Sequence, residues 1–235
     1  MRLRGLLVFL AFPLRAAWPQ PAPDSEYGAP RQAMVDLIAR RGVRDSATLA
    51  ALRAIPRHEF VLAGDRHLAY GDHPLPIGYG QTISQPYIVA YMTELLRPRP
   101  GLKMLEVGTG SGYQAAVLAQ LGCNVYTIEI YRPLADAASD RLERLGYRGV
   151  RVRHGDGHHG WPKAGPFQAI IVTAAAGHIP PALVEQLARN GRMVIPVGSV
   201  YGVQNLILVE KDPRGQVTTR ALLPVRFVPM LEGLR

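Results

Sequence analysis

Apolar and polar positions alternate regularly over the second half of the chain, from about residue 102 onward. Short apolar runs of strand length take turns with longer stretches that have helical spacing. The predicted strands are KMLEV (103–107), NVYTIEI (124–130), VRVRH (150–154), QAIIVTA (168–174) and RMVIPVG (192–198). The predicted helices between them are GYQAAVLAQL (112–121), PLADAASDRLERL (133–145) and PPALVEQLAR (180–189). This alternation predicts an α/β fold with a doubly wound, mostly parallel sheet.

The segments on either side of this region follow other patterns. Helical spacing occurs in RQAMVDLIARR (31–41) and in DSATLAALRAI (45–55), where Asp45 or Ser46 would cap the second helix. Near the C-terminus, two apolar runs within residues 203–230 flank the turn KDPRGQ. They predict an antiparallel hairpin at the sheet edge.

These patterns predict one domain with an N-terminal extension. The extension covers residues 1–30, and the domain covers residues 31–235. Within the domain, residues 31–100 form a mainly helical part, and residues 101–235 form the sheet core with its hairpin. A chain of 235 residues is long enough to bury one substantial core.

Composition limits the choice of partner and compartment. The formal net charge is +9, but the charges are scattered, so they do not indicate nucleic acid specifically. Cys123 is the single cysteine, which excludes an intrachain disulfide. The start MRLRGLLVFLAFPLRAA resembles a secretory signal, although cleavage after Ala17 would put Arg15 where a small residue is needed. We expect a cytoplasmic protein without stable membrane association, with the periplasm as the alternative if this segment is a signal. The Pro-rich stretch 18–30 is expected to be an unstructured lead-in.

The stretch KMLEVGTGSGYQAAVLA joins a strand directly to a helix through a glycine-rich turn. Gly108, Gly110 and Gly112 would let a ligand approach the free N–H groups at the start of the helix. The spacing is G-x-G-x-G, whereas the dinucleotide fingerprint needs its third glycine at position 113, which is Tyr113. The pattern therefore favours a nucleotide-type ligand other than a dinucleotide.

Two acidic residues indicate the charge of that ligand. Glu129 closes the next strand about 20 residues on, where a carboxylate can accept hydrogen bonds from ribose hydroxyls. Glu106 precedes the glycines and would repel a pyrophosphate but attract a cation. S-adenosylmethionine carries an adenosine, a sulfonium and an ammonium, so it matches this pattern better than NAD does.

A further polar loop, HGDGHHGW, follows the third strand of the core. It places Asp156 where it could reach an adenine amino group. His154, His158 and His159 lie beside it and raise the alternative of a metal cluster. Tandem histidines do not easily bind one ion, and no other residue has a spacing that completes a site. We therefore expect a solvated loop without a metal.

Several segments of the sequence resemble those of the protein-L-isoaspartate O-methyltransferases, which are also called protein-repair carboxyl methyltransferases. The matching segments, in the family's order, are IPRHEFV, LPIGYGQTISQPYIVAYMTELL, MLEVGTGSGYQAAVLAQL, RHGDG, FQAIIVTAAA and VRFVPM. GQTISQP is specific to this family among methyltransferases. The resemblance covers about residues 54–230 and implies a Rossmann-like domain that uses S-adenosylmethionine to methylate the α-carboxylate of isoaspartyl residues in damaged proteins.

The resemblance also implies which residues act on the substrate. Ser84 matches the family's active-site serine, and Thr82 and Gln85 match its neighbours in the substrate loop. Val225 and Arg226 belong to VRFVPM, which matches a segment that borders the substrate peptide.

The cofactor positions follow in the same way. Glu106, Gly108, Gly110 and Gly112 match the loop on the methionine side, Glu129 the ribose-binding acid, and Asp156 with Gly157 the adenine loop. Thr173 is a further expected cofactor contact.

Methyl transfer to a carboxylate explains why the sequence shows no convincing pair of nucleophile and base. A carboxylate with an ordinary pKa near ~4 is already ionised at neutral pH and needs no general base. Ser84 could then hold the acceptor by a hydrogen bond, with free backbone donors at the start of the helix near Pro86. From local sequence alone, Ser84 could instead cap that helix.

Three other functions share parts of this pattern. A nucleic-acid methyltransferase would suit the positive charge, but TAAAG after the fourth strand offers no side chain to stack on a base. A non-catalytic protein could keep the fold and the cofactor without turnover. A dehydrogenase is disfavoured by the glycine spacing. We expect a monomeric enzyme that acts on isoaspartyl-containing proteins and peptides and not on nucleic acid.

Overall fold

The computed structural model describes residues 26–199 and 201–234. Its α-helices are α1 (Gly28–Arg40), α2 (Ser46–Ala54), α3 (Pro86–Leu95), α4 (Tyr113–Gln120), α5 (Arg132–Arg144) and α6 (Pro181–Gln186). Its 3-10 helices are η1 (Arg57–Phe60), η2 (Ala63–Leu68), η3 (Gly157–His159) and η4 (Pro162–Ala164). Its strands are β1 (Leu75–Gly78), β2 (Gln81–Ile83), β3 (Lys103–Val107), β4 (Asn124–Glu129), β5 (Arg151–His154), β6 (Phe167–Val172), β7 (Leu187–Gly198), β8 (Gln204–Lys211) and β9 (Val217–Val225). The signal-like segment 1–17 lies outside the described residues.

The central sheet has seven strands in the order β5-β4-β3-β6-β7-β8-β9. Strands β5, β4, β3, β6 and β7 are parallel, and β8 and β9 add to β7 as an antiparallel hairpin. The strand order reverses between β3 and β6, since β4 and β5 lie on one side of β3 and the later strands on the other. In sheets of this kind ligands bind at such a switch point, beyond the carboxyl ends of the strands. The predicted fold, including the edge hairpin, is confirmed.

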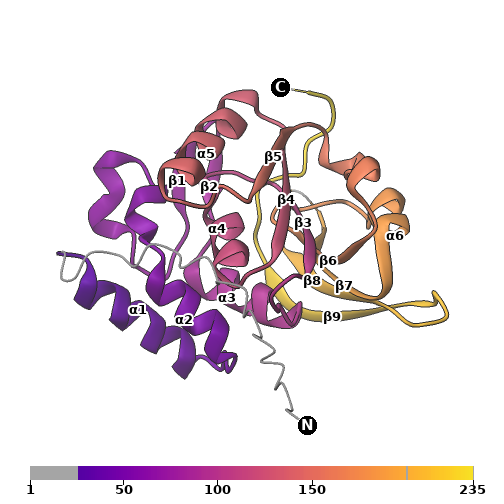
Figure 1. The fold of residues 1–235 in the computed structure, drawn as a ribbon, viewed down its shortest axis with the longest axis horizontal. Helices are drawn as coiled ribbons and strands as arrows, with labels where there is room; N and C mark the ends of the chain where they lie inside the picture. Colours follow the sequence, from indigo (N-terminus) through magenta and orange to yellow (C-terminus); the bar gives the residue numbers. More distant parts are fainter. Residues whose placement is uncertain (1–25, 200, 235) are drawn as a thin grey trace, which may run out of the picture.

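Both faces of the sheet are covered by helices. Met104 on β3 packs with the core shared by α1 to α5, whereas its neighbour Leu105 packs on the opposite face together with Leu183 of α6. Figure 1 shows the same division, with α1 to α5 on one side of the sheet and α6 on the other. Burial on both faces explains why the central strands read as continuous apolar runs. Glu106, between two such residues, is therefore drawn into the core.

The helix predicted at residues 180–189 is shorter than expected. α6 ends at Gln186, and Leu187 already begins β7, where it pairs with Phe167. Leu187 is almost completely buried in that pairing, so tertiary packing overrides the helical pattern of the segment. Asn190 then adopts a left-handed φ of 60°, which carries the chain through an irregular stretch of the strand.

Two segment boundaries also differ from the expectation. α1 begins at Gly28, so the last residues of the predicted lead-in are helical; Pro30 is tolerated there because the first turn needs no N–H. At the other end, VRFVPM is not a regular strand: β9 ends at Val225, and Pro229 makes an isolated bridge to Ala175. Pro229 lacks the N–H that a ladder needs, and the segment crosses the carboxyl ends of the parallel strands instead.

None of the helices within residues 26–199 and 201–234 is long and apolar enough to cross a membrane.

Candidate active site

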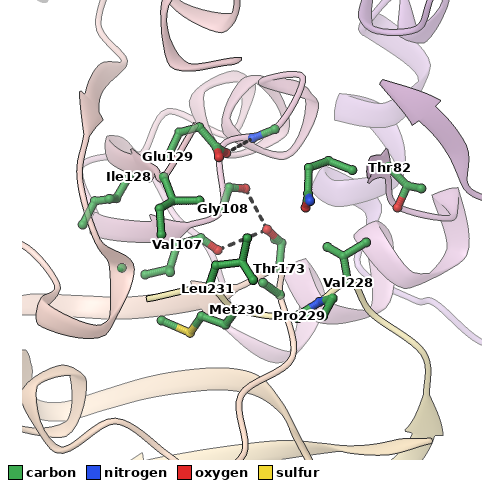
Figure 2. Close-up of a pocket in the computed structure, with 15 residues that line it drawn as sticks. Thr82, Val107, Gly108, Ile128, Glu129, Thr173, Val228, Pro229, Met230 and Leu231 are labelled. Atoms are coloured by element: carbon green, nitrogen blue, oxygen red, sulfur yellow. Dashed lines mark hydrogen bonds between the residues drawn. The ribbon is translucent and has the colours of Figure 1, made fainter. Parts of the chain in front are cut away.

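The glycine-rich turn after β3 is shaped by left-handed backbone. Gly108, Gly110 and Gly112 have φ values of 97°, 51° and 87°, a region that residues with a Cβ seldom adopt. A Cβ on Gly108 would lie 2.4 Å from Oγ1 of Thr173. Thr173 uses that hydroxyl to donate to the carbonyls of Val107 (3.1 Å) and Gly108 (2.7 Å), so it ties the end of β6 to the turn. Figure 2 shows both hydrogen bonds.

The turn borders a cavity at the carboxyl ends of β3, β4 and β6 that opens to solvent. The cavity is lined by several predicted cofactor residues, namely Gly108, Gly110, Glu129, Gly157 and Thr173. Thr82 and the C-terminal segment 228–231 close it from other sides (Figure 2).

Glu129 is held in place by backbone donors. Its Oε2 accepts a hydrogen bond from the N–H of Gly110 (2.8 Å), and its Oε1 accepts one from the N–H of Tyr131 (3.0 Å). Each carboxylate oxygen has a further lone pair, so both can still accept from a ligand. Glu129 is only 5% exposed and lines the cavity. This geometry fits two ribose hydroxyls.

A second cavity lies on the other side of the turn and contains Glu106. Glu106 is 0% exposed, and neither of its carboxyl oxygens has a hydrogen-bond partner among the described residues. Burial raises the pKa of Glu106 to about 8, partly offset by the nearby Thr127 hydroxyl and reinforced by the charge of Glu129. A carboxylate that is shielded from water and has no hydrogen-bond partner lowers the stability of the protein. A cationic ligand group beside it would offset that loss. The residues therefore fit the methionine end of S-adenosylmethionine.

Ser84 is free of the helix-capping role that its local sequence allowed. The N-cap residue of α3 is Gln85, and its side chain forms no capping hydrogen bond with the helix. Asp72, from a distant loop, does the capping: its Oδ1 accepts from the N–H of Tyr87 (2.9 Å), and its Oδ2 accepts from the Gln85 side-chain amide (3.1 Å) and from Arg41. The Ser84 hydroxyl is thereby left for other partners.

The start of α3 offers fewer free backbone donors than predicted. Pro86 has no N–H, and Asp72 already occupies the N–H of Tyr87. Asp72 also adds negative charge at this helix end, which opposes anion binding by the helix dipole.

A third cavity adjoins the first two and is lined by the predicted substrate residues. It is lined by residues that include Thr82, Ser84, Gln85, Val225 and Arg226. Thr82 and Thr173 line all three cavities, and Ser84 lines the second and the third. Ser84 therefore lies where the cavity that contains Glu106 meets an open cleft.

Comparison with known proteins identifies the family. Residues 29–235 match the model of the family described as protein-L-isoaspartate(D-aspartate) O-methyltransferase (PCMT). The chain belongs to this family.

Two curated relatives of this methyltransferase match over most of their length. It is 54% identical over 239 residues to protein-L-isoaspartate O-methyltransferase 2 of Syntrophobacter fumaroxidans, with 97% of each chain covered. It is 60% identical over 186 residues to the protein of the same name from Polaromonas sp., with 79% of this chain and 88% of the other covered.

Solved structures agree with these relatives. A protein-L-isoaspartate O-methyltransferase superposes with a TM-score of 0.78 at 28% identity, covering 86% of this chain and 66% of that one. A Plasmodium falciparum protein in complex with S-adenosyl-L-homocysteine has the same fold, with a TM-score of 0.74 at 24% identity and coverage of 86% and 99%.

Two predicted cofactor residues of this family member do not line the three cavities. Gly112 is the N-cap of α4, and a Cβ there would lie 3.2 Å from Leu142 on α5, so it permits close packing of the two helices. Asp156 is engaged by the chain itself: it accepts from the N–H of His158 (2.9 Å) and of Gly233 (3.0 Å). These hydrogen bonds outweigh burial and lower the pKa of Asp156. Its neighbour Gly157 does line the cofactor cavity.

Two of the three histidines of this loop contact protein groups through their side chains. His158 contacts Asp156 through Nδ1 at 3.1 Å, and a ring nitrogen of His154 lies 3.0 Å from the carbonyl of Ile130. Among the described residues, no group of three or more His, Cys, Asp or Glu side chains is placed to hold a metal ion.

Sequence reasoning missed two residues that shape the site. Asp72 lies 12 residues before Ser84, and its role depends on a loop returning to the start of α3. Arg57 lies within the recognised segment IPRHEFV, but only the tertiary structure shows that it is buried beneath the Ser84 loop. The apolar neighbours Ile55 and Phe60 were the only local signal of burial at that position.

Proposed function

We propose that this chain repairs damaged proteins by transferring a methyl group from S-adenosylmethionine to the α-carboxylate of L-isoaspartyl residues. The products are the methyl ester and S-adenosylhomocysteine. Membership of the methyltransferase family supports the reaction. The observation that carries the site assignment is the position of Ser84, which is not the N-cap of α3 and lines both the second cavity and the open cleft.

The residues around the first two cavities would hold the cofactor. Glu129 would bind the ribose, Gly157 would lie along the adenine with Asp156 ordering its loop, and Gly108 and Gly110 would allow close approach of the chain. Glu106 would face the cationic methionine end. When bound, S-adenosylmethionine supplies an electrophilic methyl group on a sulfonium.

The residues of the open cleft would position the acceptor. Ser84 donates a hydrogen bond to the acceptor carboxylate, and Thr82 and Gln85 flank it on the same loop. Val225 and Arg226 border the peptide, where the exposed guanidinium of Arg226 attracts an acidic chain. The acceptor arrives ionised, so these residues align charge and exclude water and need not move a proton.

We expect the enzyme to act as a monomer. We place it in the cytoplasm because the signal-like segment lacks a good cleavage site; the periplasm is the alternative. Its partners are isoaspartyl-containing proteins and peptides, without nucleic acid.

The test uses labelled S-adenosylmethionine and two synthetic peptides that differ only in isoaspartate versus aspartate. We expect a base-labile methyl ester on the isoaspartyl peptide alone. If folded protein that binds the cofactor methylates neither peptide, the repair assignment fails. Labelling of nucleic acid, with salt-dependent binding, would instead favour the nucleic-acid methyltransferase.

A further inference from the structure

Arg57, at the start of η1, is a buried cation. Its side chain is 0% exposed, and no carboxylate among the described residues forms an ion pair with it. Carbonyl groups hold it instead: Nε donates to Ala69 and Nη2 donates to Ser84, both at 2.8 Å. Nη1 has no hydrogen-bond partner among the described residues. Burying an incompletely paired charge lowers the stability of the fold. Stabilisation of the fold is therefore a weak explanation for an arginine at this position.

The same guanidinium also touches the cofactor side of the site. It lies over the ring of Tyr113, 4.7 Å from the ring centroid. Tyr113 is the first residue of α4, directly after the glycine-rich turn, and it lines the second cavity together with Ser84 and Glu106. One rigid side chain therefore contacts both the substrate loop and the start of the cofactor helix.

The bond to the Ser84 carbonyl also fixes the orientation of the next peptide group. In a trans peptide the C=O and N–H point in opposite directions. Since Arg57 holds the Ser84 carbonyl, the N–H of Gln85 must point away from the guanidinium. The cleft is lined by both Ser84 and Gln85. A carbonyl oxygen turned toward the cleft would repel an acceptor carboxylate, whereas an N–H would attract it.

We propose that Arg57 is a positioning residue for methyl transfer: it draws the Ser84 carbonyl inward, so that the Ser84 hydroxyl and the Gln85 N–H together face the acceptor carboxylate. The inference rests on the proposed function and deepens it. Arg57 acts through the loop and touches neither substrate nor the reacting atoms.

The first test is a double-mutant cycle between Arg57→Lys and Ser84→Ala. A lysine keeps the charge but lacks the planar fork that reaches two carbonyls. We expect each single variant to lower kcat/KM for the isoaspartyl peptide by about 10-fold or more, because each removes a charge-assisted contact or its alignment. In the Ser84→Ala background, Arg57→Lys should cost less than it does in the unmodified protein, because only its alignment of the Gln85 N–H is then left to lose. Calorimetric affinity for S-adenosylhomocysteine should stay within about 2-fold of the unmodified protein in all three variants.

A second pair of variants isolates the backbone donor without touching the core. Gln85 has φ −51°, which proline can adopt, so Gln85→Pro removes the N–H with little strain. Gln85→Ala removes the same side chain and keeps the N–H, so it is the reference. We expect kcat/KM for Gln85→Pro to be at least about 10-fold below that for Gln85→Ala, at equal affinity for S-adenosylhomocysteine.

Several results would overturn the proposal. They are fully multiplicative losses in the double-mutant cycle, unchanged kcat/KM in Arg57→Lys, or equal kcat/KM for Gln85→Pro and Gln85→Ala. If Arg57→Lys does not fold, the Gln85 pair decides alone. Failure of the unmodified protein to methylate the isoaspartyl peptide would be a different result, because it would reject the proposed function itself.

Discussion

The dry carboxyl group of Glu106 should make cofactor binding depend on pH. Burial raises its pKa to about 8 in the ligand-free protein, so at pH 7 only about a tenth of the molecules carry the charge. A cationic ligand favours the ionised form, so binding at pH 7 must first remove a proton. Relative to a protein in which residue 106 cannot titrate, we expect the affinity for S-adenosylmethionine to increase about tenfold between pH 7 and pH 9, with close to one additional proton released per ligand bound at pH 7.

The matched control is Glu106→Gln, which keeps the shape of the side chain and removes its titration. Titration calorimetry of both proteins, in two buffers of different ionisation enthalpy, measures affinity and proton release. The ligand's own amino group titrates equally in both experiments, so the difference between the proteins reports Glu106. At pH 9 the variant should bind about 10- to 150-fold more weakly, because a hydrogen bond to a charged group contributes ~1.5–3 kcal/mol. Identical pH profiles and proton release for the two proteins would refute the reasoning.

The same shift predicts the pH dependence of stability without ligand. The folded-state pKa of about 8 is above the ordinary value of 4.5, so the folded protein binds the extra proton between these values. The stability that this provides is complete below about pH 4.5 and is lost as the pH rises through about 8. The melting temperature of Glu106→Gln, relative to that of the unmodified protein, should therefore rise between about pH 4.5 and about pH 8 and stay level above that.

Three further predictions address other parts of the site. Ser84→Ala should lower kcat/KM for the isoaspartyl peptide by about 10- to 150-fold, because it removes one charge-assisted hydrogen bond. The cofactor affinity measured by calorimetry should be nearly unchanged, and a large loss of that affinity would place Ser84 in the cofactor pocket. Gly157→Ala would put a Cβ 2.3 Å from Val107 Cγ1, so it should weaken cofactor binding and lower the melting temperature, whereas Gly149→Ala, with nothing within 4 Å, should change neither. Asp72→Ala should destabilise the protein by ~0.5–2 kcal/mol in urea unfolding, as expected for a lost helix cap, and unchanged stability would mean that Asp72 does not cap α3.

The periodic pattern alone was enough to predict the fold class and most of the sheet. Apolar runs and helical spacing are local properties, and the connection rules for parallel strands then restrict the topology. The same rules bring the carboxyl ends of β3 and β4 together, so the glycine turn and Glu129 could be assigned to one ligand site before any coordinates. Local pattern failed at Leu187, where burial against β6 ended a helix early.

Other features depended on contacts between residues far apart in the sequence. From local sequence Ser84 could cap a helix or bind a ligand, and the structure excludes the capping role because Asp72 caps α3 from another loop. Glu106 was expected to meet a cation, but its complete burial and raised pKa come from the layers packed on both sides of β3. Arg57 likewise supports the Ser84 loop only in the folded protein, where its side chain donates a hydrogen bond to the Ser84 carbonyl. Sequence determines which groups are available for the chemistry. Which of these groups hydrogen-bond to one another, and which keep contact with water, is decided only when all the elements are packed together.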